Sequence, residues 1–377
     1  MSPVTSTFPV SGFRFQKISP PPYVVGYLAY AIGHPRALQN PGGLPNFHSS
    51  MKRPFLLLVL GLAVTTLTFA EEKSALAPAP KPAQPRIPDT VELKANLPYA
   101  GNDNLRQALD LYLPKTRAND KPLPVVVYIH GGGWSGGSRA GGGPALAFAA
   151  SGNYAGISVG YRLSAEVKWP AQIHDCKAAI RWIRGHAKEY NLDPDHIGVT
   201  GTSAGGHLVC LLGLTEGVKE LEGSIGEFTR LSSRVTCVAN FCGPTDMASP
   251  LMQGEAALKD DPAVAGLLGG PIAEKAAEAK AASPLTYVHA GAPPFLTAHG
   301  TKDMRVNFTN ATRLHEALTK AGSPSILLPL TDAGHGFFNP ELNHRVQQFF
   351  DMHLRGIQSE ISSDPIPLPA PPEAVKK

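Results

Sequence analysis

Short apolar runs alternate with longer segments of helical spacing along the chain from about residue 107 onward. The apolar runs predict strands at residues 124–130, 154–159, 196–200, 235–241, 294–299 and 325–330. Between them, apolar side chains recur every three or four positions and predict helices at residues 172–190, 204–214, 308–321 and 343–354. Strands that are apolar throughout and alternate with helices are typical of parallel sheets. We therefore expect an α/β fold in which helices cover both faces of a mostly parallel, twisted sheet.

Two segments depart from this alternation. Residues 107–113 (QALDLYL) alternate between apolar and polar positions, which predicts a half-exposed strand nearer the edge of the sheet. Residues 247–290 interrupt the order of strands and helices, and their Ala-rich stretch at 274–282 (EKAAEAKAA) favours helix. We expect this segment to be a small helical insertion that caps one end of the sheet.

The N-terminal part of the chain carries the pattern of an export signal at residues 51–70. Lys52 and Arg53 precede an apolar stretch that ends in small residues at Ala70. Because signals stand at the N-terminus, we expect residues 1–50 to be an upstream misread or a disordered extension. The signal predicts a secreted or periplasmic protein.

Two Pro-rich segments bound the expected folded domain. Residues 71–90 have the composition of a linker, and residues 357–377 that of a tail, which we expect to be disordered from Ser359. The folded domain is therefore predicted to span residues 91–356, a length that can bury one substantial core.

Composition and charge exclude several classes of protein. Of the 377 residues, 43% are hydrophobic, so the chain is not disordered throughout. The net charge of +4 is too small and scattered to favour a nucleic-acid partner. No apolar run reaches the roughly 18 residues of a spanning helix, so no stable membrane span is expected once the signal is cleaved. The oligomeric state stays open.

The cysteines give no clear disulfide framework. An even number in an exported protein permits three pairings of Cys176, Cys210, Cys237 and Cys242. Cys237 and Cys242 are five residues apart, so on one strand they would face opposite sides of the sheet. We favour buried free thiols. The chain also lacks a CxxC or a closely spaced histidine pair that would suggest a metal site.

A candidate nucleophile stands between a predicted strand and a predicted helix. The sequence GTSAG at residues 201–205 places Ser203 on that turn, with glycines two residues to either side. Such a turn lifts the serine into an exposed, strained position at the carboxyl end of the sheet.

A Gly-rich loop, HGGGW at residues 130–134, follows another predicted strand. Attack on an acyl carbonyl creates an oxyanion, which needs backbone N–H donors already aimed at it. We expect Gly132, Gly133 and Ala204 to supply these donors. His130 is expected to brace the loop, and a phosphate-binding reading lacks the Gly-Lys-Ser/Thr ending.

The expected order of serine, acid and histidine along the chain selects two further residues. Asp303 and His335 each follow a predicted strand, so both should lie at the same sheet edge as Ser203. His335 would take the serine proton, and Asp303 would fix the imidazole tautomer. Asp246 and Asp332 are alternative acids, of which Asp332 more plausibly shapes the histidine loop.

Three further side chains lie close to these motifs. Trp134 and Tyr161 follow predicted strand ends and are possible pocket-lining residues, although ordinary packing explains them equally well. His207 stands on the predicted helix after Ser203, where we expect it to pack beneath the site.

Six motifs occur together in one order: HGGGW, Tyr161-Arg162-Leu163, DPDHIGVTGTSAGGHL, GPTD, HGTKD and AGHGF. With them, the chain from about Gln107 to Leu354 resembles the α/β-hydrolase superfamily. It is most similar to secreted esterases like the bifunctional feruloyl and acetylxylan esterases, near the hormone-sensitive-lipase-like group. The resemblance implies acyl-serine chemistry at Ser203, Asp303 and His335, and no cofactor.

The sequence thus predicts a carboxylesterase or lipase-like serine hydrolase. Export makes extracellular carbohydrate esters, or small aryl or alkyl esters, the expected substrates. An arylformamidase-like amide hydrolase, whose loop also reads HGG-x-W, remains an alternative. A hydrolase fold kept only for binding is a second alternative, but all three catalytic candidates are present.

Overall fold

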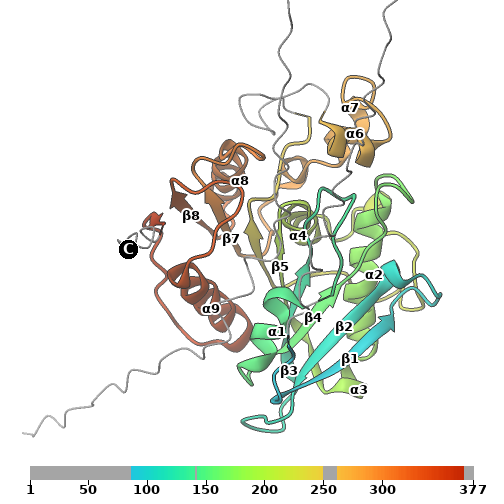
Figure 1. Ribbon diagram of the computed structural model, residues 1–377, viewed down its shortest axis with the longest axis vertical. Coiled ribbons are helices and arrows are strands. Elements are labelled where there is room, and N and C mark those ends of the chain that lie inside the picture. Colours follow the sequence, from blue (N-terminus) through green and yellow to red (C-terminus); the bar gives the residue numbers. More distant parts are fainter. Residues whose placement is uncertain (1–85, 141, 249–260, 369–377) are drawn as a thin grey trace, which may run out of the picture. The chain divides into compact units, whose positions relative to one another are not determined.

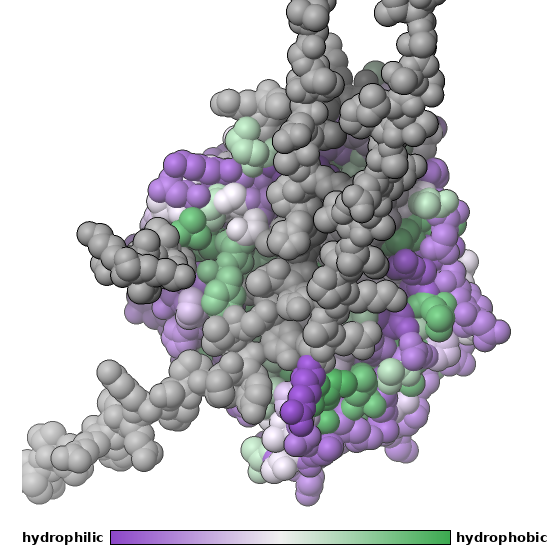
Figure 2. All heavy atoms as spheres, viewed as in Figure 1, coloured by the Kyte–Doolittle hydropathy of each residue, from purple (hydrophilic) through white to green (hydrophobic). Residues whose placement is uncertain are grey.

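The computed structural model describes residues 86–140, 142–248 and 261–368 of the chain (Figure 1). The expected N-terminal extension, the signal and most of the linker therefore lie outside the described residues. Within the described ranges, no helix is both long and apolar enough to cross a membrane. Hydrophilic side chains occupy much of the visible described surface, with smaller apolar patches between them (Figure 2).

A single sheet of nine strands runs through the described domain in the order β1-β2-β4-β3-β5-β6-β7-β8-β9. The β1–β2 and β2–β4 pairs are antiparallel and the other six pairs are parallel. The sheet is thus mostly parallel, as the sequence predicts. The strands are β1 (Val91–Pro98), β2 (Ala108–Pro114), β3 (Leu123–Ile129), β4 (Ala155–Val159), β5 (Leu192–Thr202), β6 (Cys237–Phe241), β7 (Phe295–Gly300), β8 (Ser325–Thr331) and β9 (Ile366–Pro367).

Helices pack on both faces of this sheet. They are α1 (Gly143–Ala150), α2 (Ala171–Gly185), α3 (Ala187–Tyr190), α4 (Ala204–Leu214), α5 (Lys219–Glu222), α6 (Pro262–Leu268), α7 (Ala276–Ala281), α8 (Thr309–Lys320) and α9 (Pro340–Arg355). Short 3-10 turns cover Leu105–Gln107 (η3) and Pro284–Tyr287 (η5). Successive β3 residues belong to different apolar clusters: Val125 to one that includes residues of α2, α4 and α8, and Val126 to one that includes residues of α1 and α9.

The strand expected to be half exposed is a correction. Every residue of β2 is buried, including its polar Asp110. The sequence pattern did not predict β1, which pairs with the outer edge of β2 and makes β2 an interior strand. Asp110 is compensated in this position by an ion pair with Arg139 at 3.1 Å. Because this partly buried ion pair allows a polar residue in an interior strand, polarity alone does not predict the position of β2.

Other expectations were closer to the structure. The predicted helix at 172–190 is interrupted at His186, which separates α2 from α3. Helix α7 lies within the Ala-rich stretch at 274–282, and α6 lies in the same predicted insertion, of which residues 249–260 fall outside the description. All four cysteines are buried free thiols, as favoured.

The beginning of the Pro-rich tail is ordered, which contradicts the expected disorder from Ser359. Strand β9 pairs in parallel with β8, and Ile366 is only 1% exposed within the apolar cluster that contains Phe349. Arg345 of α9 donates hydrogen bonds to the carbonyls of Ser362 and Asp364 at 2.9 and 2.7 Å. These contacts compensate the carbonyl groups of an irregular segment, and composition does not reveal them.

We predict that Ile366→Ala lowers the free energy of unfolding by about 2–3 kcal/mol, because it removes a buried side chain from the core. Leu368→Ala is the matched control, since Leu368 is 40% exposed and its truncation should change stability by less than about 0.5 kcal/mol. Urea unfolding of both variants measures the difference. Equal stabilities would show that the C-terminal strand contributes nothing to the core.

Candidate active site

Ser203 stands on a strained turn between β5 and α4. Its backbone angles, φ 56° and ψ −120°, lie where L side chains rarely occur. A Cβ atom added at Gly201 would lie 2.4 Å from the carbonyl oxygen of Gly205, and one at Gly205 would lie 2.1 Å from that of Ile129. Only glycine fits at these two positions, so the GTSAG spacing follows from the crowding of the turn.

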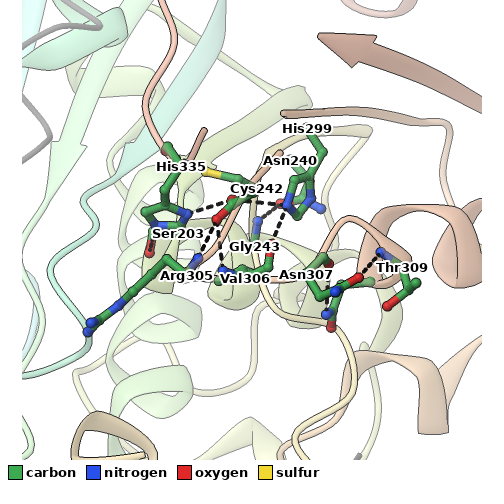
Figure 3. A network of polar contacts seen from close by, with 12 residues as sticks. Ser203, Asn240, Cys242, Gly243, His299, Arg305, Val306, Asn307, Thr309 and His335 are labelled. Carbon is green, nitrogen blue, oxygen red and sulfur yellow. Dashed lines mark hydrogen bonds and ion pairs between the residues drawn. The ribbon is translucent and has the colours of Figure 1, made fainter. Parts of the chain in front are cut away.

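The structure brings Ser203, His335 and Asp303 together at the carboxyl ends of β5, β8 and β7. Figure 3 shows the Ser203 and His335 side chains next to each other. The distance from Ser203 Oγ to His335 Nε2 is 2.9 Å, and that from His335 Nδ1 to Asp303 Oδ2 is 2.7 Å. The serine hydroxyl can donate to Nε2 while the protonated Nδ1 donates to the carboxylate. This is the arrangement in which an imidazole takes a proton from a serine.

The Asp303 carboxylate is held on both oxygens. Its Oδ1 accepts from the amides of Arg305 and Val306 at 2.8 and 2.9 Å. On Oδ2, a second histidine contributes: His299 Nε2 lies 3.1 Å from this oxygen and 2.8 Å from the Val306 carbonyl. Sequence reasoning missed this role of His299, although its place four residues before Asp303, at the end of a strand, was a usable signal.

Burial and hydrogen bonding act in opposite directions on the two ionisable partners. Burial raises the pKa of Asp303, but hydrogen bonds from His299 and His335 outweigh it and hold that pKa below its usual value. Burial lowers the pKa of His335, but the hydrogen bond to Asp303 outweighs it, so the net pKa is raised. Asp303 therefore stays ionised and keeps the proton of the neutral imidazole on Nδ1.

This electrostatic arrangement predicts the pH dependence of the site. His335 acts as a base only when Nε2 is unprotonated, and the raised pKa moves that deprotonation to higher pH. We expect kcat/KM for p-nitrophenyl acetate to rise with pH, with a midpoint above the ordinary histidine value of about 6.5. A profile from about pH 5 to about pH 10 measures it. A midpoint at or below the ordinary value would contradict the effect of Asp303.

The two alternative acids point elsewhere. Asp246 forms an ion pair with Arg313 of α8 at 2.6 Å. Asp332 pairs with Lys302 at 2.8 Å, and its side chain is 61% exposed. Neither carboxylate contacts His335, so the geometry selects Asp303 among the three candidates.

The HGGGW loop follows β3 with three consecutive residues in the left-handed region: Gly132 at φ 113°, Gly133 at φ 58° and Trp134 at φ 55°. Among the described residues, we find no carbonyl that accepts from the amides of Gly132, Gly133 or Ala204. Ala204 is also the first residue of α4, where the helix dipole favours negative charge. These amides are therefore the candidates for binding an oxyanion.

Two buried histidines brace this loop. His130 Nδ1 donates to the Gly131 carbonyl at 2.8 Å, and burial lowers the His130 pKa to about 4. His207 accepts from Trp134 Nε1 at 3.2 Å and donates from Nε2 to the Ala282 carbonyl at 2.7 Å. Burial also lowers the His207 pKa to about 4, so both rings are neutral at physiological pH. The expected packing roles of both histidines are found.

Tyr161 is a correction to the expected pocket lining. Its side chain is fully buried, its ring stacks on His130 with centroids 4.3 Å apart, and its hydroxyl donates to the His130 carbonyl at 3.0 Å. Tyr161 therefore packs against the first residue of the HGGGW loop and is not among the pocket-lining residues. Trp134, the other expected lining residue, does lie at the pocket.

A pocket opens next to the Ser203 side chain. Its lining residues are Gly133, Trp134, Ser203, Pro244, Asp261, Ala263, Val264, Arg305 and Val306. Several of them come from α6 and the residue that caps it, so part of the predicted insertion forms one wall. The lining is apolar except for the nucleophile and two charged residues, Asp261 and Arg305. Sequence reasoning identified neither of these two as a site residue.

Within the described part of the chain, Cys242, Asp303 and His335 form a group of potential metal ligands. Their ligand atoms all lie within 4.8 Å of one another. Two of these groups, however, are joined by the short hydrogen bond between His335 and Asp303. A metal bound here would compete with the proton that this bond holds, so the arrangement fits proton transfer better than metal binding.

Comparison with protein families matches residues 109–318 to the BD-FAE family. Esterase LipQ of Mycobacterium tuberculosis is 31% identical over 248 residues, which cover 64% of this chain and 57% of LipQ. The chain thus spans little more than half the length of this curated relative.

Solved structures of esterases share the fold. A truncated carbohydrate esterase from gut microbiota superposes with a TM-score of 0.65 at 32% identity, covering 71% of this chain and 98% of that one. Thermogutta terrifontis esterase 2, phosphonylated by sarin, gives a TM-score of 0.57 at 29% identity, covering 73% of this chain and 99% of the esterase.

Proposed function

Because this chain belongs to the BD-FAE family, we propose that it is a serine carboxylic-ester hydrolase that works through an acyl-serine intermediate. The observation that carries the proposal is the continuous line of hydrogen bonds from Ser203 Oγ through His335 to Asp303. Beside Ser203 lie a pocket and three amides for which the described part of the chain supplies no acceptor, so nucleophile, base and oxyanion donors are close together.

The proposed reaction uses these groups in two halves. Ser203 Oγ attacks the ester carbonyl carbon as His335 Nε2 takes its proton, and the amides of Gly132, Gly133 and Ala204 bind the resulting oxyanion. His335 then gives the proton to the alcohol oxygen as the C–O bond breaks. In the second half, water loses a proton to His335 and attacks the acyl-serine, and Ser203 recovers its proton as the acid leaves.

We propose extracellular carbohydrate esters, or small aryl and alkyl esters, as the substrates. The export signal at residues 51–70 supports this location, and the name of the similar carbohydrate esterase supports the substrate class. N-terminal sequencing of the native protein tests the export, for which a start at Glu71 is expected. A retained Met1 would contradict export without affecting the chemistry.

Covalent labelling tests the acyl-serine mechanism. We expect paraoxon to inactivate the protein and to leave a diethylphosphoryl group on the peptide that contains Ser203, as read by mass spectrometry. The unlabelled protein should hydrolyse p-nitrophenyl acetate and, in a substrate panel, methyl ferulate or acetylated xylan. Turnover of N-formylanilides without ester turnover would favour the amide hydrolase, and absence of both would favour a binding protein.

A further inference from the structure

The pocket beside Ser203 contains two charged residues that differ in their bonding. Asp261 caps α6: its Oδ1 accepts from the amides of Ala263 and Val264 at 2.7 and 3.1 Å. Arg305 has no such compensation. Among the described residues, we find no carboxylate within ion-pair distance of its guanidinium and no acceptor for its side-chain N–H groups. Among the described residues, the pocket thus carries one guanidinium that has no carboxylate partner.

Three other arginines of the described domain, by contrast, are paired with carboxylates. Arg313 pairs with Asp246, Arg162 with Asp175 and Arg139 with Asp110. Arg305 instead projects from the loop that carries Asp303, and Figure 3 shows its side chain extended away from that loop.

The backbone of this loop is fixed relative to the nucleophile. The amide of Arg305 donates to Asp303 Oδ1 at 2.8 Å, and the neighbouring Val306 is buried. The exposed Arg305 side chain therefore begins two residues from the acid that orients His335, and it lines the same pocket as Ser203. A ligand group held by this guanidinium would be close to an ester bound at Ser203.

We propose that Arg305 makes the enzyme selective for esters that carry a carboxylate a few bonds from the scissile carbonyl. This inference rests on the ester hydrolysis proposed above. A guanidinium presents a planar fork of N–H donors that matches a carboxylate, and it stays charged at all accessible pH values. The oxyanion already has its own donors in Gly132, Gly133 and Ala204, so a second anion on the substrate is the group that Arg305 can bind.

The substrate carboxylate can lie on the acyl part or on the alcohol part of the ester. Two matched pairs of substrates distinguish these two positions. Monoethyl succinate and ethyl succinamate place a carboxylate or a neutral amide on the acyl side. 4-Acetoxybenzoate and 4-acetoxybenzamide do the same on the alcohol side. In each pair the two substrates have similar shape and differ in charge, so the ratio of their kcat/KM values isolates the electrostatic preference.

We expect the purified full chain to prefer the carboxylate in one of the two pairs by about tenfold, the effect of one charge-assisted hydrogen bond at an exposed site. Arg305→Gln should reduce that ratio to about one, and Arg305→Lys should retain part of it. Arg313→Gln is the matched control, because Arg313 does not line the pocket. The preference should also fall in 0.5 M NaCl, roughly three times the physiological ionic strength, because the guanidinium is exposed.

Two results would overturn the inference. A ratio near one for both pairs in the unmodified protein would mean that the pocket does not select carboxylates. An equal loss on all four esters in Arg305→Gln would mean that the residue assists every substrate alike. In either case, continued hydrolysis of the neutral esters would leave the proposed function intact, whereas absence of any Ser203-dependent turnover would remove both.

Discussion

Replacing Ser203 by alanine is expected to lower kcat/KM for p-nitrophenyl acetate by roughly 10⁵-fold. The reason is geometric: the Oγ atom 2.9 Å from His335 Nε2 is the proposed nucleophile, and alanine has no oxygen that could form the acyl intermediate. The amides of Gly132, Gly133 and Ala204 remain in the variant, so a small residual rate above the uncatalysed reaction is expected.

Steady-state kinetics with freshly purified variant measures this loss, and circular dichroism confirms that the fold is intact. Ser232→Ala is a suitable control, because this exposed serine does not line the pocket and should retain the full rate. Unchanged turnover in Ser203→Ala would mean that the esterase reaction occurs at another residue.

The central part of the fold was predictable from the sequence for a physical reason. Strands β3, β5, β6 and β7 are buried on both faces, so their runs of apolar residues stand out against the helices between them. The edges were not predictable. Strand β2 carries Asp110, whose burial depends on Arg139 from a distant loop, and β9 is held by carbonyl contacts to Arg345.

The candidate site likewise has a part that was predictable from the sequence and a part that was not. Residues that follow strands at one sheet edge must lie near each other, so Ser203, Asp303 and His335 could be brought together from their order in the chain. The hydrogen bond between His299 and Asp303 depends on the rotamer of His299. The unpaired state of Arg305 depends on the described carboxylates lying too far from its guanidinium. The spacing of His299 and Asp303 gave a signal for the first, but the second depends on how segments distant in the chain are folded.

Replacing Asp303 by asparagine is expected to lower kcat by about 10⁴-fold while the protein stays folded. Asparagine can keep the shape of the carboxyl group, but its amide N–H₂ would face His335 Nδ1. The imidazole would then carry its proton on Nε2, the atom that must accept the proton of Ser203. Because the histidine loses the hydrogen bond that contributes most to raising its pKa, the lowering effect of burial is opposed less, and its pKa should fall.

Asp246→Asn is the matched control, since its carboxylate pairs with Arg313 and does not contact the imidazole, so its rate should stay close to that of the unmodified protein. Kinetics on both variants measures the difference, and NMR titration of His335 in each variant reads the expected fall of its pKa in Asp303→Asn only. A large loss in Asp246→Asn with little loss in Asp303→Asn would assign the acid to the other loop. Such a result would require the histidine loop to move during the reaction, because in the structure only Asp303 of these two acids reaches the ring.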